Sequence, residues 1–209
     1  MRRIVWGRAT SSNVMKVLWG LGELNLPFER IDVGGSFGKT ETPEYLAMNP
    51  TRLVPTLQED DFTLWESNVI LRYLGQAHAP GSTLWPQEAH MRANVDRWMD
   101  AQQTQMNRPM GVVFWGLIRT PSDKRDPAAI AQGIADAAKA YGLIEPLLGR
   151  HAYIAGPDFT LADIPWGVHA HRWFNMEFDR PLLPNLRSWY DRLCERPAYR
   201  QHVMSCPII

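Results

Sequence analysis

Short polar motifs in the first third of the chain have residue types that suit the binding of an anion. Ser11, Ser12 and Asn13 follow a short apolar segment and precede a helical pattern, and Glu66 and Ser67 precede another. A helix N terminus carries free N–H groups and a partial positive charge, so hydroxyls beside it can help to hold an anion such as a carboxylate. Such clusters also serve as turns and helix caps, so their position alone does not assign a role.

The elements that would position these motifs alternate between strand and helix over roughly the first 78 residues. Val14, Val17, Leu18 and Leu21 form the stripe of a core-facing helix. Strands are predicted at residues 3–6, 28–33, 54–58 and 62–65, with a loop at 34–42, a short helix at 44–48 and a helix beginning at Ser67. The predicted order is therefore βαβαββα.

The strand patterns stop after this region, and helical stripes continue to the end of the chain. Residues 91–99 and 130–148 carry such stripes, Thr160 to Asp163 forms a variant capping box, and a further helix is predicted from Pro184 to about Glu195. We therefore expect an α/β domain at residues 1–78, a linker at 79–87 and an all-helical domain at 88–209.

Composition excludes several classes of function. Of the 209 residues 45% are hydrophobic and 21% charged, and the 22 basic side chains balance 22 acidic ones. This balance does not favour nucleic acid or a membrane surface as a partner, and no apolar run is long enough to span a bilayer. The two cysteines, Cys194 and Cys206, lack metal-ligand spacing, and His169 and His171 would diverge on a helix, so no metal site is expected. So few cysteines also favour a location in the reducing cytoplasm.

The chain resembles the cytosolic glutathione transferase superfamily over nearly its whole length. The resemblance depends on the order and spacing of a few motifs: Asn49-Pro50 followed by Val54-Pro55, then Glu66-Ser67-Asn68, then Gly156-x-x-Phe159-Thr160-Leu161-Ala162-Asp163. The turn from Thr10 to Asn13 looks like that of the serine-type subfamilies, with theta-like or bacterial nu-like features. The resemblance implies a thioredoxin-like first domain and a helical second domain.

The resemblance also implies how glutathione would be held. Val54-Pro55 would have a cis peptide bond, and the Val54 backbone would pair with the cysteinyl residue of glutathione as an added strand does. Ser67 would hold the γ-glutamyl carboxylate at the helix N terminus, and Glu66 would face the ammonium group. The family often places a cation for the glycyl carboxylate near Thr40 and Leu53; here Lys39 and Arg52, beside them, would substitute.

Ser11, Ser12 and Asn13 are the candidate donors to the glutathione sulfur. Lowering a thiol pKa by two units from about 8.5 requires about 2.7 kcal/mol. A hydrogen bond to a charged group supplies about 1.5–3 kcal/mol and a helix N terminus about 0.3–1 kcal/mol, so no general base is required. The resemblance favours Ser11 as the donor with Asn13 assisting and Ser12 capping the helix, while the theta pattern points to Ser12.

For the second substrate, the apolar segment around Met110, Phe114 and Trp115, with Trp173, is expected to wall a pocket for a hydrophobic electrophile. The predicted activity is conjugation of glutathione, a detoxification reaction, by a homodimeric enzyme. Glutathione-dependent reduction of disulfide bonds, a zeta-like isomerase, and a non-catalytic binding or interaction module remain as alternatives.

Overall fold

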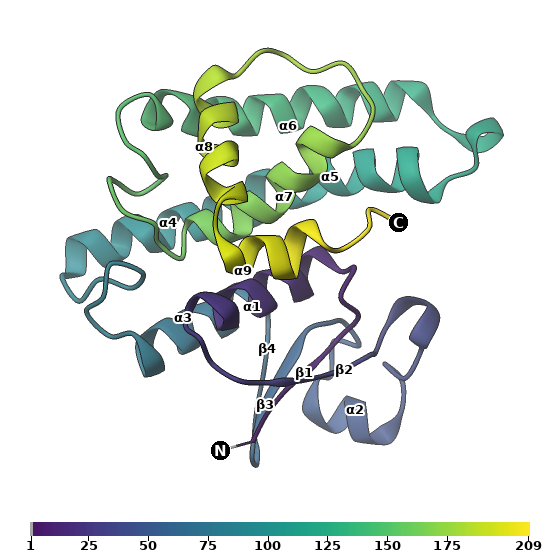
Figure 1. Ribbon diagram of the computed structural model, residues 1–209. Coiled ribbons are helices and arrows are strands. Elements are labelled where there is room, and N and C mark those ends of the chain that lie inside the picture. The colour runs from purple at the N-terminus through teal and green to yellow at the C-terminus, as the bar shows by residue number, and fades with distance from the viewer. Residues whose placement is uncertain (1) are drawn as a thin grey trace.

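The computed structural model describes residues 2–209. A four-stranded sheet lies at one end of the molecule, and the helices of the second half of the chain lie at the other (Figure 1). The helices α1 and α3 lie between the sheet and this helical half, and α2 lies on the side away from it. The predicted fold class, a thioredoxin-like domain followed by a helical domain, is confirmed.

The first domain has the predicted element order. Its elements are β1 (Arg3–Trp6), α1 (Ser12–Glu23), β2 (Glu29–Ile31), η1 (Gly35–Phe37), α2 (Pro43–Met48), β3 (Thr56–Glu59), β4 (Phe62–Trp65) and α3 (Ser67–His78). The strand order is β2-β1-β3-β4, in which β1 and β2 are parallel and the other neighbours antiparallel. β3 begins at Thr56, later than predicted, because Pro55 has no N–H to donate to the ladder.

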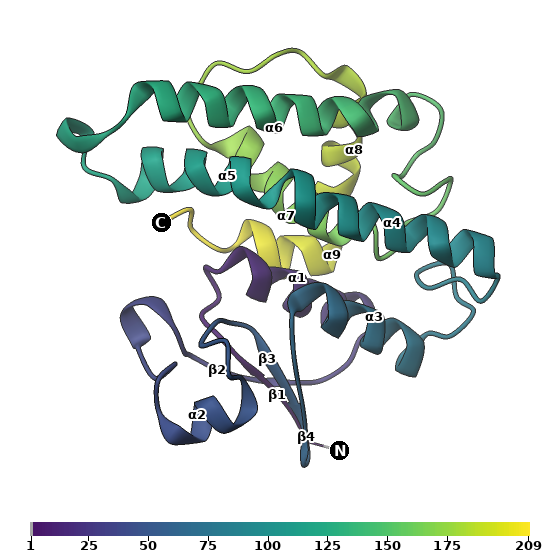
Figure 2. The ribbon, with the colours of Figure 1, turned by 180° about the vertical axis from the view of Figure 1, so that it is seen from behind.

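Residues 79–88 connect the first domain to α4 and form no helix or strand. The helical elements are α4 (Ala89–Gln105), α5 (Asn107–Phe114), η2 (Trp115–Arg119), η3 (Ser122–Lys124), α6 (Pro127–Leu148), α7 (Asp163–Asn175), α8 (Pro184–Cys194), α9 (Pro197–Tyr199) and η4 (Arg200–Met204). Figure 2 shows α4 and α5 following one another along one side, with α6 beside them. Within residues 2–209 no helix has the length and apolar character needed to cross a membrane.

The helix α1 is buried on opposite faces because it packs against both domains. Val17 and Leu21 belong to a core with residues of the sheet, such as Leu57. Met15 and Trp19 belong to the larger core of the helical domain. The N terminus of α1 is thereby fixed at the boundary between the two domains.

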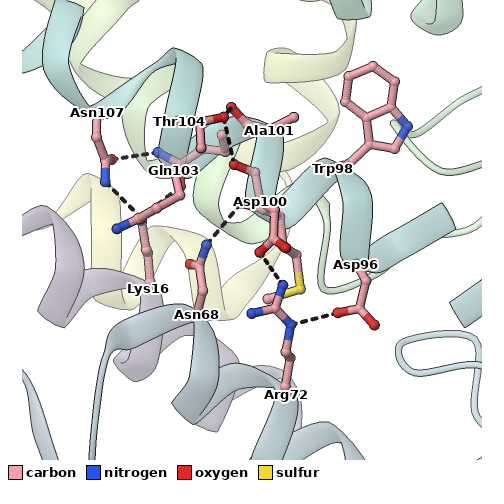
Figure 3. Close-up of polar contacts among 12 residues, drawn as sticks. Lys16, Asn68, Arg72, Asp96, Trp98, Asp100, Ala101, Gln103, Thr104 and Asn107 are labelled. Atoms are coloured by element: carbon pink, nitrogen blue, oxygen red, sulfur yellow. Dashed lines mark hydrogen bonds and ion pairs between the residues drawn. The ribbon is translucent and has the colours of Figure 1, made fainter. Parts of the chain in front are cut away.

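Polar contacts join α3 to α4 across this boundary (Figure 3). The Arg72 guanidinium forms ion pairs with Asp96, at 2.6 Å, and with Asp100. The Asn68 side-chain amide donates a hydrogen bond of 2.9 Å to the carbonyl oxygen of Met99. These contacts hold the two domains in one orientation, which any site between them requires.

Candidate active site

The polar turn that precedes α1 lies at the domain boundary. Ser11 is the N-cap residue, with extended φ and ψ of −79° and 125°, and its side chain makes no capping hydrogen bond. Ser12 is already helical, so the expectation that Ser12 caps the helix is wrong. Because the Ser11 hydroxyl does not bond to the helix backbone, it is available to donate to a bound group.

The N terminus of α3 meets that of α1. Ser67, the first residue of α3, is only 3% exposed, and its hydroxyl donates to the Asn13 side-chain oxygen over 3.3 Å. This contact leaves the Asn13 amide nitrogen as the free end of that side chain. Glu66 adopts a positive φ of 72°, which costs a residue other than glycine about 1–3 kcal/mol and is concentrated at ligand sites.

The segment before β3 is held by buried polar side chains whose role the sequence did not reveal. The Asn49 amide donates hydrogen bonds of 3.0 Å to the Leu53 carbonyl oxygen and to the Thr56 hydroxyl. The Tyr45 hydroxyl donates to the same carbonyl over 2.6 Å. The peptide bond that follows, Val54-Pro55, is cis, as the resemblance implied. The Asn49-Pro50 motif therefore has a mechanical role, to fix the backbone at Val54.

The residues expected at the glycyl end lie on exposed loops. The Arg52 side chain forms an exposed ion pair of 3.4 Å with Glu41, and the Leu53 side chain points into solvent. Lys39 is also exposed and lies in the loop before α2. These three residues do not line the interdomain cleft described next.

An interdomain cleft of about 530 Å³ opens at the N terminus of α1. Residues from both domains line it: Arg8, Thr10, Ser11, Ser12, Asn13, Gly35, Ser36, Phe37, Asn107, Gly111, Phe114, Trp115, Arg119, His169, Arg172 and Ile209. The structure thus brings the three candidate sulfur donors to the same cleft as the predicted aromatic wall. A second cavity, lined by residues such as Pro86, Met91 and Pro157, contains none of these donors, so the interdomain cleft is the candidate active site.

Two residues assigned to the pocket wall from the sequence are wrongly assigned. Met110 is completely buried and Trp173 is 1% exposed, and both belong to the core of the helical domain. The Trp173 ring packs against Tyr141 and Phe178 within the core of the helical domain, and Trp173 does not line the cleft. Phe114 and the 63% exposed Trp115 do line the cleft. An apolar pattern in the sequence does not show which of its side chains pack in the core and which line a cleft.

The three arginines of the cleft, Arg8, Arg119 and Arg172, were not predicted from the sequence. Arg172 is 8% exposed, donates a 3.3 Å hydrogen bond to the Thr10 carbonyl oxygen, and lies 3.9 Å from the centre of the Phe114 ring. Burial and the charges of Arg8 and Arg119 lower the pKa of Arg172 to about 10, so it remains a cation at neutral pH. One feature of the sequence could have indicated the role of Arg172. No acidic residue stands three or four positions away on its helix, so no neighbour on that helix pairs with its charge.

Below the cleft, a chain of hydrogen bonds links α1 to α4 and α5. The Lys16 ammonium group donates to Gln102 over 3.0 Å, and the Gln102 amide donates to Asn107 over 2.7 Å. The Asn107 oxygen also lies 3.0 Å from Nε2 of His169. Burial lowers the pKa of Lys16 to about 7 and that of His169 well below its usual value, so His169 is neutral. Neutral His169 has no imidazolium proton to give to a substrate at neutral pH, and Lys16 is completely buried and does not line the cleft.

The fold and this cleft define the class of protein. A thioredoxin-like domain provides two converging helix N termini and a backbone segment beside a cis proline, and a helical domain closes the cleft. The family model for the "Glutathione S-transferase, N-terminal domain" matches residues 10–77.

Similarity over the full chain identifies the family. Glutathione S-transferase GstB of Escherichia coli K12 is 40% identical over 203 residues, which cover 96% of this chain and 97% of that protein. Glutathione S-transferase F13 of Arabidopsis thaliana is 31% identical, with 93% and 92% covered. The structure of the theta-class glutathione S-transferase from Xanthomonas axonopodis pv. citri, with glutathione bound, has a TM-score of 0.94, 42% identity and 98% coverage of both chains. The chain belongs to the glutathione S-transferase family.

Proposed function

We propose that this transferase binds glutathione against the first domain, with the sulfur at the N terminus of α1, and catalyses its attack on an electrophile held in the interdomain cleft. The observation that carries the proposal is the contact between Ser67 and Asn13, which places the N termini of α3 and α1 side by side. A carboxylate at one helix N terminus and a thiolate at the other would each be stabilised by free N–H groups. The bound glutathione in the related Xanthomonas enzyme supports this ligand.

The rest of glutathione would follow the backbone from Val54 to Ser67. The Val54 N–H and carbonyl groups make no hydrogen bond within residues 2–209, so they can pair with an extended peptide. Ser67 would hold the γ-glutamyl carboxylate and Glu66 its ammonium group. Lys39 and Arg52 would meet the glycyl carboxylate. A cytoplasmic location would suit a substrate that must remain a reduced thiol.

Thiol activation in this site would require no general base. The Ser11 hydroxyl, the Ser12 hydroxyl and the Asn13 amide nitrogen are the available donors, and the N terminus of α1 adds a partial positive charge. One charge-assisted hydrogen bond with the helix end supplies about 2–4 kcal/mol, which covers the roughly 2.7 kcal/mol needed for a shift of two pKa units. We propose Ser11 as the principal donor, because it is the N-cap residue and its hydroxyl has no capping bond.

The test is a pH titration of the thiolate absorbance of bound glutathione in the wild type and in Ser11→Ala, Ser12→Ala and Asn13→Ala. We expect the wild type to lower the thiol pKa, Ser11→Ala to restore most of it, and Ser12→Ala to change it little. If glutathione binds the wild type with an unchanged thiol pKa, the proposal of thiol activation is wrong and a non-catalytic binding role takes its place. If Ser12→Ala has the larger effect, Ser12 is the donor.

We also propose that the protein is a homodimer. Trp65 on β4, Val69 on α3 and Met91 on α4 are exposed large apolar side chains, which a subunit interface would cover. One chain has a mass of 23.9 kDa. Sedimentation equilibrium should give about twice that mass, and a mass of one chain would refute the proposal.

A further inference from the structure

The proposed glutathione site leaves the three arginines of the cleft without a role. Arg8 comes from the turn between β1 and α1, Arg119 from the end of η2, and Arg172 from α7. Three separate elements therefore direct positive charge into one cavity. None of the residues that line this cavity has an acidic side chain.

These arginines lack carboxylate partners. Within the described part of the chain, none of the three lies within 4.0 Å of a carboxylate oxygen. Nε of Arg8 is buried and has no hydrogen-bond partner in residues 2–209. The only hydrogen bond found for the Arg172 guanidinium there is the one to the Thr10 carbonyl oxygen. Arg172 is buried, Arg8 is half-buried and Arg119 is exposed. Buried cations are normally paired, because removing a charge from water is costly, so the absence of a carboxylate partner is most unusual at Arg172 and Arg8.

The backbone beside Arg8 is shaped to accommodate its guanidinium. Gly34 and Gly35 have positive φ values of 81° and 61°. A Cβ atom on Gly35 would lie 3.1 Å from Nε of Arg8, and one on Gly34 would lie 3.2 Å from its Nη1. Only glycines allow both this backbone path and this close approach. The backbone at the start of η1 therefore has the shape that the Arg8 guanidinium requires.

A purely structural role accounts for Arg172 alone. Its stacking on Phe114 and its bond to Thr10 join the helical domain to the first domain. It does not account for Arg8, or for the charge of Arg119, which lies 5.7 Å from the centre of the same ring. Burial and the charges of Arg8 and Arg119 lower the pKa of Arg172. Burial and the charge of Arg119 likewise lower the pKa of Arg8. An anion bound among the three would convert this repulsion into attraction.

We propose that the second substrate of this enzyme is an electrophile that carries a negatively charged group, such as a carboxylate or a sulfonate, held by Arg8, Arg119 and Arg172. This inference rests on the proposed function of the same cleft. Guanidinium groups present paired donors that match the oxygens of such an anion. Phe37, Phe114 and Trp115 provide the apolar wall for the rest of the molecule. The carboxylates of glutathione are assigned elsewhere, to Ser67 and to the loops with Lys39 and Arg52.

The test compares two electrophiles that differ in charge and share shape and leaving group: chlorodinitrobenzoate and chlorodinitrobenzamide. In both reactions a carbon–sulfur bond forms, the carbon–chlorine bond breaks, and chloride leaves with the bonding pair, so nothing is oxidised or reduced. The kcat/KM of each is divided by its uncatalysed rate constant with glutathione. The variants are Arg8→Gln and Arg119→Gln, and the control is Arg108→Gln, an exposed arginine of α5 that lines a different cavity.

We expect the wild type to prefer the benzoate, and Arg8→Gln and Arg119→Gln each to lower this preference about tenfold through the benzoate alone. Arg108→Gln should leave both rates unchanged. Equal normalised rates for the two electrophiles in the wild type would overturn the proposal. So would variants that slow both reactions equally, or that shift only the thiol pKa of bound glutathione, because the arginines would then act on glutathione.

Calorimetry with unreactive dinitrobenzoate and dinitrobenzamide separates this inference from the proposed function. If the benzoate binds more tightly than the amide in wild type and this difference falls in Arg119→Gln, the anion site exists even if no thiolate forms. If a thiolate forms in the binary complex while the benzoate binds no better than the amide, the proposed function stands and the inference fails.

Discussion

Replacement of Asp163 by alanine should destabilise the helical domain more than any substitution of a surface carboxylate. Asp163 is completely buried, and its two oxygens accept hydrogen bonds from the Ile154 N–H at 3.0 Å, the Thr160 N–H at 2.9 Å, the Thr160 hydroxyl at 3.2 Å and the Trp189 indole N–H at 2.9 Å. One side chain thereby joins the loop before α7 to the N terminus of α7 and to α8.

The magnitude follows from the donors that lose their acceptor. The two backbone N–H groups and the indole N–H cannot reach water when Asp163 is removed, and each buried unsatisfied donor costs about 1–3 kcal/mol. Burial raises the pKa of Asp163 to about 6 despite these bonds, so its charge is itself costly and part of the loss is recovered. We expect a net loss of about 3 kcal/mol in the free energy of unfolding, a large share of a typical total.

The measurement is urea unfolding followed by tryptophan fluorescence near neutral pH, at fixed protein concentration. The control is Asp136→Ala, an exposed carboxylate on α6 that accepts one hydrogen bond from Gln132, and it should change the free energy of unfolding by less than about 0.5 kcal/mol. An Asp163→Ala variant as stable as this control would show that the four bonds do not hold the domain together, and would refute the reasoning.

Further predictions concern Lys16, Asn49 and Gly35. Because burial lowers the pKa of Lys16 to about 7, the unfolded chain binds one more proton above that pH, and wild-type stability should rise relative to Lys16→Met between about pH 7 and 10. Parallel pH profiles of unfolding for the two proteins would contradict this. Asn49→Ala should cost about 2 kcal/mol and weaken glutathione binding in calorimetry, since the Leu53 carbonyl and the Thr56 hydroxyl each lose a donor. Unchanged affinity would show that the segment at Val54 is held by other contacts. Gly35→Ala should lower the free energy of unfolding by about 1–2 kcal/mol, because Gly35 has a φ of 61°. It should also weaken dinitrobenzoate binding by displacing the Arg8 guanidinium. Unaltered binding would show that Gly35 does not position Arg8.

Local patterns in the sequence determined most of the fold. The stripe of Val14, Val17 and Leu21 defined α1 because a helix repeats its faces every 3.6 residues, and that period is visible in the sequence. The polar motifs ahead of α1 and α3 were recognisable because helix N termini need partners for their free N–H groups. Both motifs line or adjoin the cleft, so their general placement required no tertiary information.

The tertiary structure alone decided which residues complete the cleft. Arg8 and Arg172 are far apart in the sequence, and only the packing of α7 against the β1–α1 turn brings them together. Packing within the helical domain buried Met110 and Trp173, which share an apolar character with the cleft residue Trp115. The type of a side chain indicates how readily it can be buried. Which neighbour buries it depends on contacts between segments that are distant in the sequence, and such contacts leave no periodic pattern in the sequence.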